Sequence, residues 1–88
     1  MELNIEISQR ELSFKVDNQL GSSLNELIET ASDKTIGSIR ISGESKSYTF
    51  LRQVALFVNL ITKLGDCRVE LKSKCFSICE NTIAPIYK

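Results

Sequence analysis

The strongest constraint on the fold is a strict alternation of apolar and polar side chains in several segments of the chain. The first segment is LNIEISQRELSFKV, which alternates from Leu3 and then, with the parity switched, from Leu12. Because neighbouring side chains of a β-strand point to opposite faces, a switch of parity across SQRE is typical of a hairpin turn. We therefore predict strands over 2–8 and 11–17.

The alternation returns later in the chain. In IGSIRISGESKSYTF, Ile39 and Ile41 share one parity, SGES has the composition of a turn, and Tyr48 and Phe50 share the other parity. The pattern predicts a second hairpin.

A third hairpin is predicted in CRVELKSKCFSICE. The apolar positions begin at Cys67 and resume at Phe76 after a short KSK turn. The tail over 82–88 is expected to be partly extended, and Pro85 fits only an edge or a terminus because it has no backbone N–H to donate.

Two segments have the periodicity of helices. Over 23–32, Ser23 and Glu26 have the spacing of a capping box. The apolar residues of this segment recur at helical spacing: Leu24, Leu27, Ile28 and Ala31. A second helix is predicted from residue 51 to Leu64, with Gly65 in the position of a terminating glycine.

These elements predict an α+β fold with the order ββαββαββ. We expect an antiparallel sheet of five or six strands with two helices on one face, because the strands alternate in polarity and do not form continuous apolar runs. The short similarity of NIEIS, SIRIS and RVELK suggests a repeated ββα unit, although such alternation is common in half-buried strands. The 88 residues are expected to form a single small domain, 1–88.

Composition excludes several classes of function. The 11 basic and 11 acidic side chains cancel, so the chain lacks the overall positive field of nonspecific nucleic-acid binders. The sequence contains no histidine, the commonest general base and metal ligand. We find no motif for a catalytic residue, a cofactor or a metal, and we predict a non-enzymatic protein that needs no cofactor and no small-molecule substrate.

The three cysteines are Cys67, Cys75 and Cys79. Metal binding normally requires four soft ligands, so we interpret the cysteines as free thiols that act as small hydrophobic residues. The alternative is a redox pair between Cys67 and either of the others across the third hairpin. The opening MELNIEISQR lacks the charge and apolar run of a secretory signal, and no apolar run is long enough to span a bilayer; we therefore expect a cytoplasmic protein.

The second helix is more apolar than packing on a sheet requires. At 100° per residue, Leu56 and Leu60 lie away from the arc that faces the sheet and beside Gln53. Arg52, Asn59 and Lys63 lie together on a side that we expect to face water. Three interpretations are open: the leucines pack on the first helix, they form a surface for another protein, or they are scattered exposed leucines of the kind that many proteins show. In the second case Leu56, Leu60, Gln53, Arg52 and Lys63 are the predicted interface.

Basic residues offer another surface. Arg40, Arg68 and Lys72 are predicted to align on the exposed sheet face, where nucleic acid could bind. Glu6, Glu44 and Glu70 interleave with them, so cross-strand ion pairing is the competing interpretation.

The function that we predict is therefore protein binding. The expected protein is a small regulator or inhibitor, like immunity proteins and antitoxins in size, whose partner is another protein or a second copy in a homodimer. The alternatives are a nucleic-acid-binding regulator that uses the basic strip and a thiol-based sensor.

Overall fold

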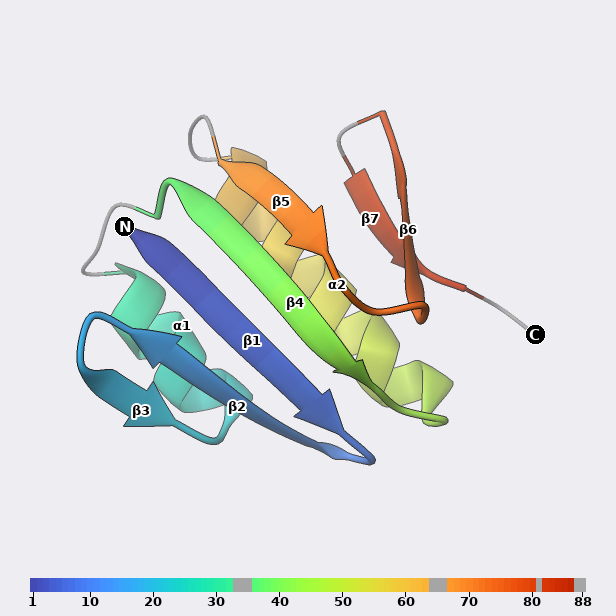
Figure 1. The fold of residues 1–88 in the computed structure, drawn as a ribbon, viewed down its shortest axis with the longest axis horizontal. Helices are drawn as coiled ribbons and strands as arrows, with labels where there is room; N and C mark the ends of the chain where they lie inside the picture. Colours follow the sequence, from blue (N-terminus) through green and yellow to red (C-terminus); the bar gives the residue numbers. More distant parts are fainter. Residues whose placement is uncertain (33–35, 64–66, 81, 87–88) are drawn as a thin grey trace.

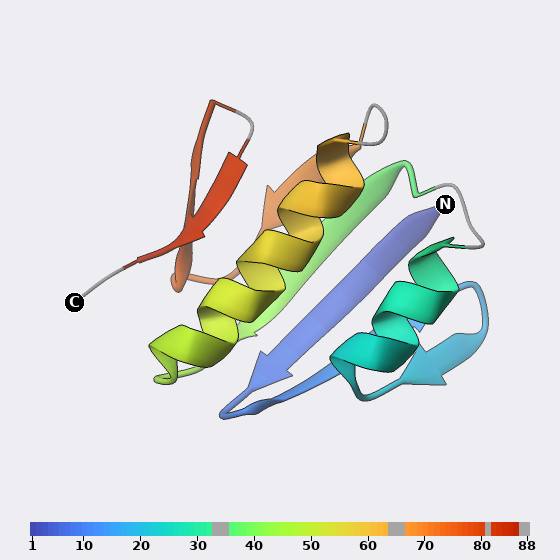
Figure 2. The ribbon, with the colours of Figure 1, turned by 180° about the vertical axis from the view of Figure 1, so that it is seen from behind.

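The structure, a computed structural model, describes residues 1–32, 36–63, 67–80 and 82–86. Within these residues the main sheet has five strands in the order β3-β2-β1-β4-β5. Their bounds are Glu2–Ser8 (β1), Glu11–Val16 (β2), Gln19–Gly21 (β3), Ser38–Glu44 (β4) and Arg68–Leu71 (β5). Helices α1 (Leu24–Ser32) and α2 (Tyr48–Lys63) both cover one face of this sheet, as predicted (Figure 1 and Figure 2).

The first hairpin is confirmed. Strands β1 and β2 are antiparallel, with Ile5 opposite Phe14, so the two parities predicted from the sequence face the same side. The short strand β3 continues the meander and was not predicted. It follows a tight turn in which Asp17 has a φ of 51°, a conformation that aspartate tolerates better than most residues.

The second predicted hairpin is wrong. Strand β4 ends at Glu44 and α2 begins at Tyr48, so Tyr48 and Phe50 belong to the first turn of the helix. Ser47 begins the helix, because its side-chain oxygen accepts a hydrogen bond from the N–H of Phe50 at 3.4 Å. The spacing of Tyr48 and Phe50, two positions apart, is compatible with a strand or with the first turn of a helix. The hydrogen bond of the Ser47 side chain favours the helix.

The sheet is consequently mixed, and the prediction of a purely antiparallel sheet is wrong. A helix that joins two strands returns the chain to the end where the first strand began, so β4 and β5 are parallel. Strand β1 is also parallel to β4. The similar segments NIEIS, SIRIS and RVELK are these three neighbouring strands, and not the starts of three hairpins. The observed order is βββαβαβββ, and not ββαββαββ.

The third predicted hairpin is also wrong. Strand β5 pairs with β4, where Val69 lies opposite Ile39, while β6 (Phe76–Cys79) pairs with β7 (Thr82–Pro85) in a separate two-stranded sheet. We call this pair the β6–β7 hairpin. The part of the predicted tail over 82–85 is thus a strand, and Pro85 occupies its last position, as the missing N–H requires.

The first helix begins as predicted. The N–H of Glu26 donates to the Ser23 hydroxyl at 3.2 Å, and the Glu26 carboxylate accepts from the N–H of Ser22 at 3.0 Å. These bonds satisfy backbone donors that the helix itself leaves free. The predicted end of the second helix at Leu64 and Gly65 lies outside the described residues.

The core lies between the sheet and the two helices. The inward residues of β1, β2 and β4 are almost completely buried, and they contact the buried side of each helix. The helix contributions to this core are Leu27, Leu51, Val54, Ala55, Phe57 and Val58. The opposite face of the sheet is polar, and neither of the two described helices covers it (Figure 1). Among the described residues, no helix has both the length and the apolarity to cross a membrane.

Candidate functional site

The outer side of α2 exposes two leucines. Leu56 is 60% exposed and Leu60, one turn later, is 59% exposed, whereas Val54 and Val58 on the opposite side are completely buried. The interpretation in which the leucines pack on the first helix is therefore wrong. Their position outside the arc of the helix that faces the sheet is confirmed, because exposure along a helix follows its 3.6-residue period.

Polar residues flank the two leucines. Arg52 and Gln53 are both exposed and lie one turn before Leu56, and two turns before Leu60, on the same helix. We call Arg52, Gln53, Leu56 and Leu60 the outer face of α2. Lys63 is the last residue of the helix, and its side chain lies outside the described part of the structure.

Asn59 was expected to face water together with Arg52, and this expectation is wrong. Its side-chain amide donates to the carbonyl of Ile83 at 2.8 Å, and its amide oxygen accepts from the N–H of Ile83 at 2.9 Å. Asn59 thus provides the donor and the acceptor that the backbone of β7 needs. These two hydrogen bonds attach the β6–β7 hairpin to the side of α2, beside the outer face.

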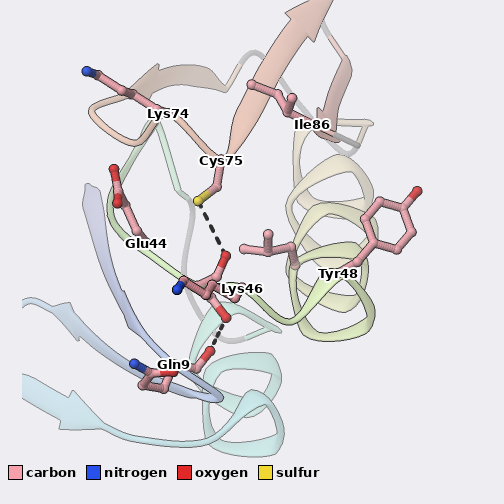
Figure 3. A pocket seen from close by; sticks show the side chains of 9 residues that line it. Gln9, Glu44, Lys46, Tyr48, Lys74, Cys75 and Ile86 are labelled. Atoms are coloured by element: carbon pink, nitrogen blue, oxygen red, sulfur yellow. Dashed lines mark hydrogen bonds between the residues drawn. The ribbon is translucent and has the colours of Figure 1, made fainter. Parts of the chain in front are cut away.

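A cleft of about 630 Å³ lies beyond the carboxyl ends of β1 and β4, at the start of α2 (Figure 3). Open parallel sheets commonly bind ligands at this edge. The residues that line it come from four separate segments: Gln9, Glu44, Ser45, Lys46, Tyr48, Leu51, Lys74, Cys75 and Ile86. Sequence reasoning missed the cleft because it treated SGES as a hairpin turn; recognising Ser47 as a helix start would have indicated the strand–helix edge.

The polar groups of the cleft bond mainly to one another. The Ser45 hydroxyl donates to the carbonyl of Gln9 and accepts from the N–H of Ser47, and the Cys75 thiol donates to the carbonyl of Ser45 at 3.6 Å (Figure 3). The charged groups at its border have both signs, with Glu44 beside two lysines. These bonds fasten the loops together, and they leave no convergent set of groups of one charge for a ligand.

The predicted basic strip is partly neutralised. Arg40 and Glu70 are opposite each other on β4 and β5 and form a cross-strand ion pair at 3.2 Å. Arg68 is exposed on β5, and Lys72 is exposed on the segment directly after β5. Glu70 lies between them in the sequence. The geometry gives the nucleic-acid hypothesis no support beyond these two exposed cations.

The cysteines do not lie on paired strands. Cys67 precedes β5 in the main sheet, whereas Cys79 ends β6 in the separate hairpin, so the predicted pairing across a third hairpin is wrong. Cys79 is exposed and Cys75 is half-buried. Burial raises the pKa of the Cys67 thiol, an effect that the positive amino terminus partly opposes. A protonated thiol is a weak nucleophile.

No group of three or more Cys, Asp or Glu side chains among the described residues is arranged to hold a metal ion. Comparison of the chain with known protein families, with curated proteins and with solved structures gave no match. We therefore infer function from the surface of the molecule itself.

Proposed function

We propose that this protein acts by binding another polypeptide through the outer face of α2, as a non-catalytic regulator or inhibitor. The observation that carries the proposal is the exposure of Leu56 and Leu60, 60% and 59%, side by side on one helix. Each leucine that a partner covered would contribute about 1–2 kcal/mol of transfer free energy before entropic costs, because part of each residue is already buried. Flanking Arg52 and Gln53 can bond to polar groups at the rim of such an interface.

The chain offers a matched control for this face. Leu20 is 78% exposed and lies opposite Lys15 in the β2–β3 ladder, so it projects from the polar face of the sheet, away from the helices. A photo-crosslinking amino acid at position 56 or at position 20, in cells that produce the protein, compares two exposed leucine sites on opposite faces. We expect a discrete crosslinked product from position 56 and none from position 20.

The Leu56→Asp and Leu60→Asp variants extend the test. Both sites are exposed, so the free energy of unfolding of the isolated chain should change by no more than about 0.5 kcal/mol. Leu60→Asp should remove the crosslinked product that forms from position 56, and Leu20→Asp should keep it. No crosslink specific to position 56, or one that Leu60→Asp leaves unchanged, would refute the proposal.

A further inference from the structure

The cleft at the start of α2 lies at the point where the connections of the main sheet separate. Strands β1 and β4 are parallel neighbours. After β1 the chain continues to β2 on one side, and after β4 it passes through α2 to β5 on the other side. Open α/β sheets commonly bind ligands at such a switch point. The cleft volume of about 630 Å³ is within the range of small-molecule sites, about 300–1,000 Å³.

Three charged side chains at the border of the cleft are not used by the fold. Glu44, Lys46 and Lys74 are exposed, and none of these side chains forms an ion pair or a hydrogen bond with another described residue. In Figure 3 they lie on the strand side of the cleft, with Glu44 between the two lysines. A carboxylate binds an ammonium group and a lysine binds a carboxylate, so this side of the cleft can bind groups of both charges.

The other side of the cleft is apolar. Leu51 lines it from α2, and Ile86 lines it from the segment directly after β7. Ile86 is 41% exposed and lies toward α2 in Figure 3. An apolar group that covered this side chain would remove its surface from water, which favours binding. The cleft therefore has a charged side and an apolar side.

We infer that the cleft binds a small zwitterion with an apolar body, namely a free amino acid with an aliphatic or aromatic side chain. Glu44 accepts hydrogen bonds from the ammonium group, the two lysines donate to the carboxylate, and the apolar body contacts Leu51 and Ile86. A simple anion would be repelled by Glu44, and a simple cation by the lysines. This inference goes beyond the proposed function, because the cleft and the outer face of α2 are different surfaces.

Titration with free leucine and free phenylalanine, followed by the amide chemical shifts in NMR spectra, tests the inference. Saturable shifts should appear at Ser45, Lys46 and Ile86, and none in β3, at the far edge of the sheet. N-acetylleucine lacks the ammonium group and leucinamide lacks the carboxylate, so each should bind about tenfold more weakly than leucine. Glycine, which has no apolar body, should also bind more weakly than leucine.

Substitution of Glu44 tests the contact with the ammonium group. Glu44→Gln should weaken leucine binding about tenfold and leave the binding of N-acetylleucine unchanged, because that probe has no ammonium group. Glu2→Gln is the matched control, since Glu2 is an exposed carboxylate at the opposite end of β1. This control should leave leucine binding unchanged.

Two cysteines provide a second measurement. Cys75 lines the cleft, whereas exposed Cys79 does not, so bound leucine should slow the alkylation of Cys75 and leave that of Cys79 unchanged. The absence of saturable shifts with both leucine and phenylalanine would overturn the inference. Equal binding of leucine, N-acetylleucine and leucinamide would overturn it too, as would saturable shifts without protection of Cys75.

Discussion

Asn59 shows how much one side chain contributes to the arrangement around the outer face of α2. Its amide group pairs with both backbone groups of Ile83, whose side chain is almost completely buried. Strand β7 pairs with β6 along one edge only. At its other edge, the Asn59 side chain makes the two backbone hydrogen bonds that a neighbouring strand would otherwise make. The β6–β7 hairpin is therefore fixed to the helix by polar bonds as well as by the burial of Ile83.

Replacing this residue tests its role. Asn59→Ala leaves the N–H and carbonyl of Ile83 without their partner, which costs about 1–3 kcal/mol. We expect a lower urea midpoint and faster hydrogen exchange at the amides of β7 than in the wild-type protein, with little change in β1. Thr49→Ala, at an exposed position of the same helix outside the outer face, is the control and should change stability by less than about 0.5 kcal/mol. Equal effects of the two substitutions would contradict the role.

The cysteines are expected to differ in reactivity with pH. Because burial raises the pKa of Cys67, its thiolate is scarcer than that of an ordinary cysteine at neutral pH, and alkylation should accelerate as the pH rises toward that pKa. Exposed Cys79 should react first. Mass spectrometry of the alkylated peptides measures both rates, and unfolding in urea should make them equal. Faster alkylation of Cys67 than of Cys79 in the folded protein at neutral pH would contradict this expectation.

The decisive element is the connection between β4 and α2. Because of this connection, β4 is the first strand of a parallel β-α-β unit, although its alternation of apolar and polar residues is equally typical of a hairpin strand. Ser47 starts the helix, and Ser45 fastens the connection to the turn after β1 by accepting the N–H of Ser47 and donating to Gln9. These contacts hold the helix start, and with it the direction of the outer face of α2.

Substitution of Ser47 tests this helix start. Ser47→Ala removes the side-chain acceptor for the N–H of Phe50 and should lower the free energy of unfolding by about 0.5–2 kcal/mol. Ser47→Asp retains an acceptor and places a negative charge at the positive end of the helix dipole, so it should preserve stability. Chemical denaturation of both variants gives the comparison. An Asp variant as unstable as the Ala variant would show that the side chain does not cap the helix.

At the scale of the whole molecule, the two faces have different properties. The face without helices combines both charge signs within one sheet, as in the pair of Arg40 with Glu70. The helix face exposes Leu56 and Leu60 beside Arg52 and Gln53. The apolar exposure is thus on the helix face, and this is the physical basis for proposing that a partner binds there.

Thermal stability distinguishes a second copy from a different protein as the partner of the outer face of α2. A dimer that buries this face makes the unfolding midpoint rise with protein concentration, because the folded state alone associates. If the partner is a second copy, we expect this dependence in the wild-type protein and in Leu20→Asp, and none in Leu56→Asp. Calorimetry at several concentrations measures it. A midpoint independent of concentration in the wild-type protein would argue against a dimer.

Much of the candidate site could be predicted from the sequence. Leu56 and Leu60 were placed on the outside of the second helix by their angles alone, and the structure leaves them exposed. That they form an interface stays a prediction. Asn59 could not be placed, because its partner Ile83 comes from a strand that no local pattern connects to the helix. The cleft was missed for the same reason, since four distant segments build it.

The sequence by itself determined where β1, β2 and α1 lie and which side of each strand is buried, because side-chain direction repeats every 2.0 residues in a strand and every 3.6 in a helix. On α1 the predicted stripe is confirmed at Leu27, which is buried, and not at Ile28, which is 48% exposed. Only the tertiary structure decided which strands are neighbours. Whether β4 turns back as a hairpin or continues into α2 depends on a few capping bonds, and each outcome gives a different partner to every later strand. Alternation is a property of one strand, whereas parallel or antiparallel pairing is a property of two strands and the path between them.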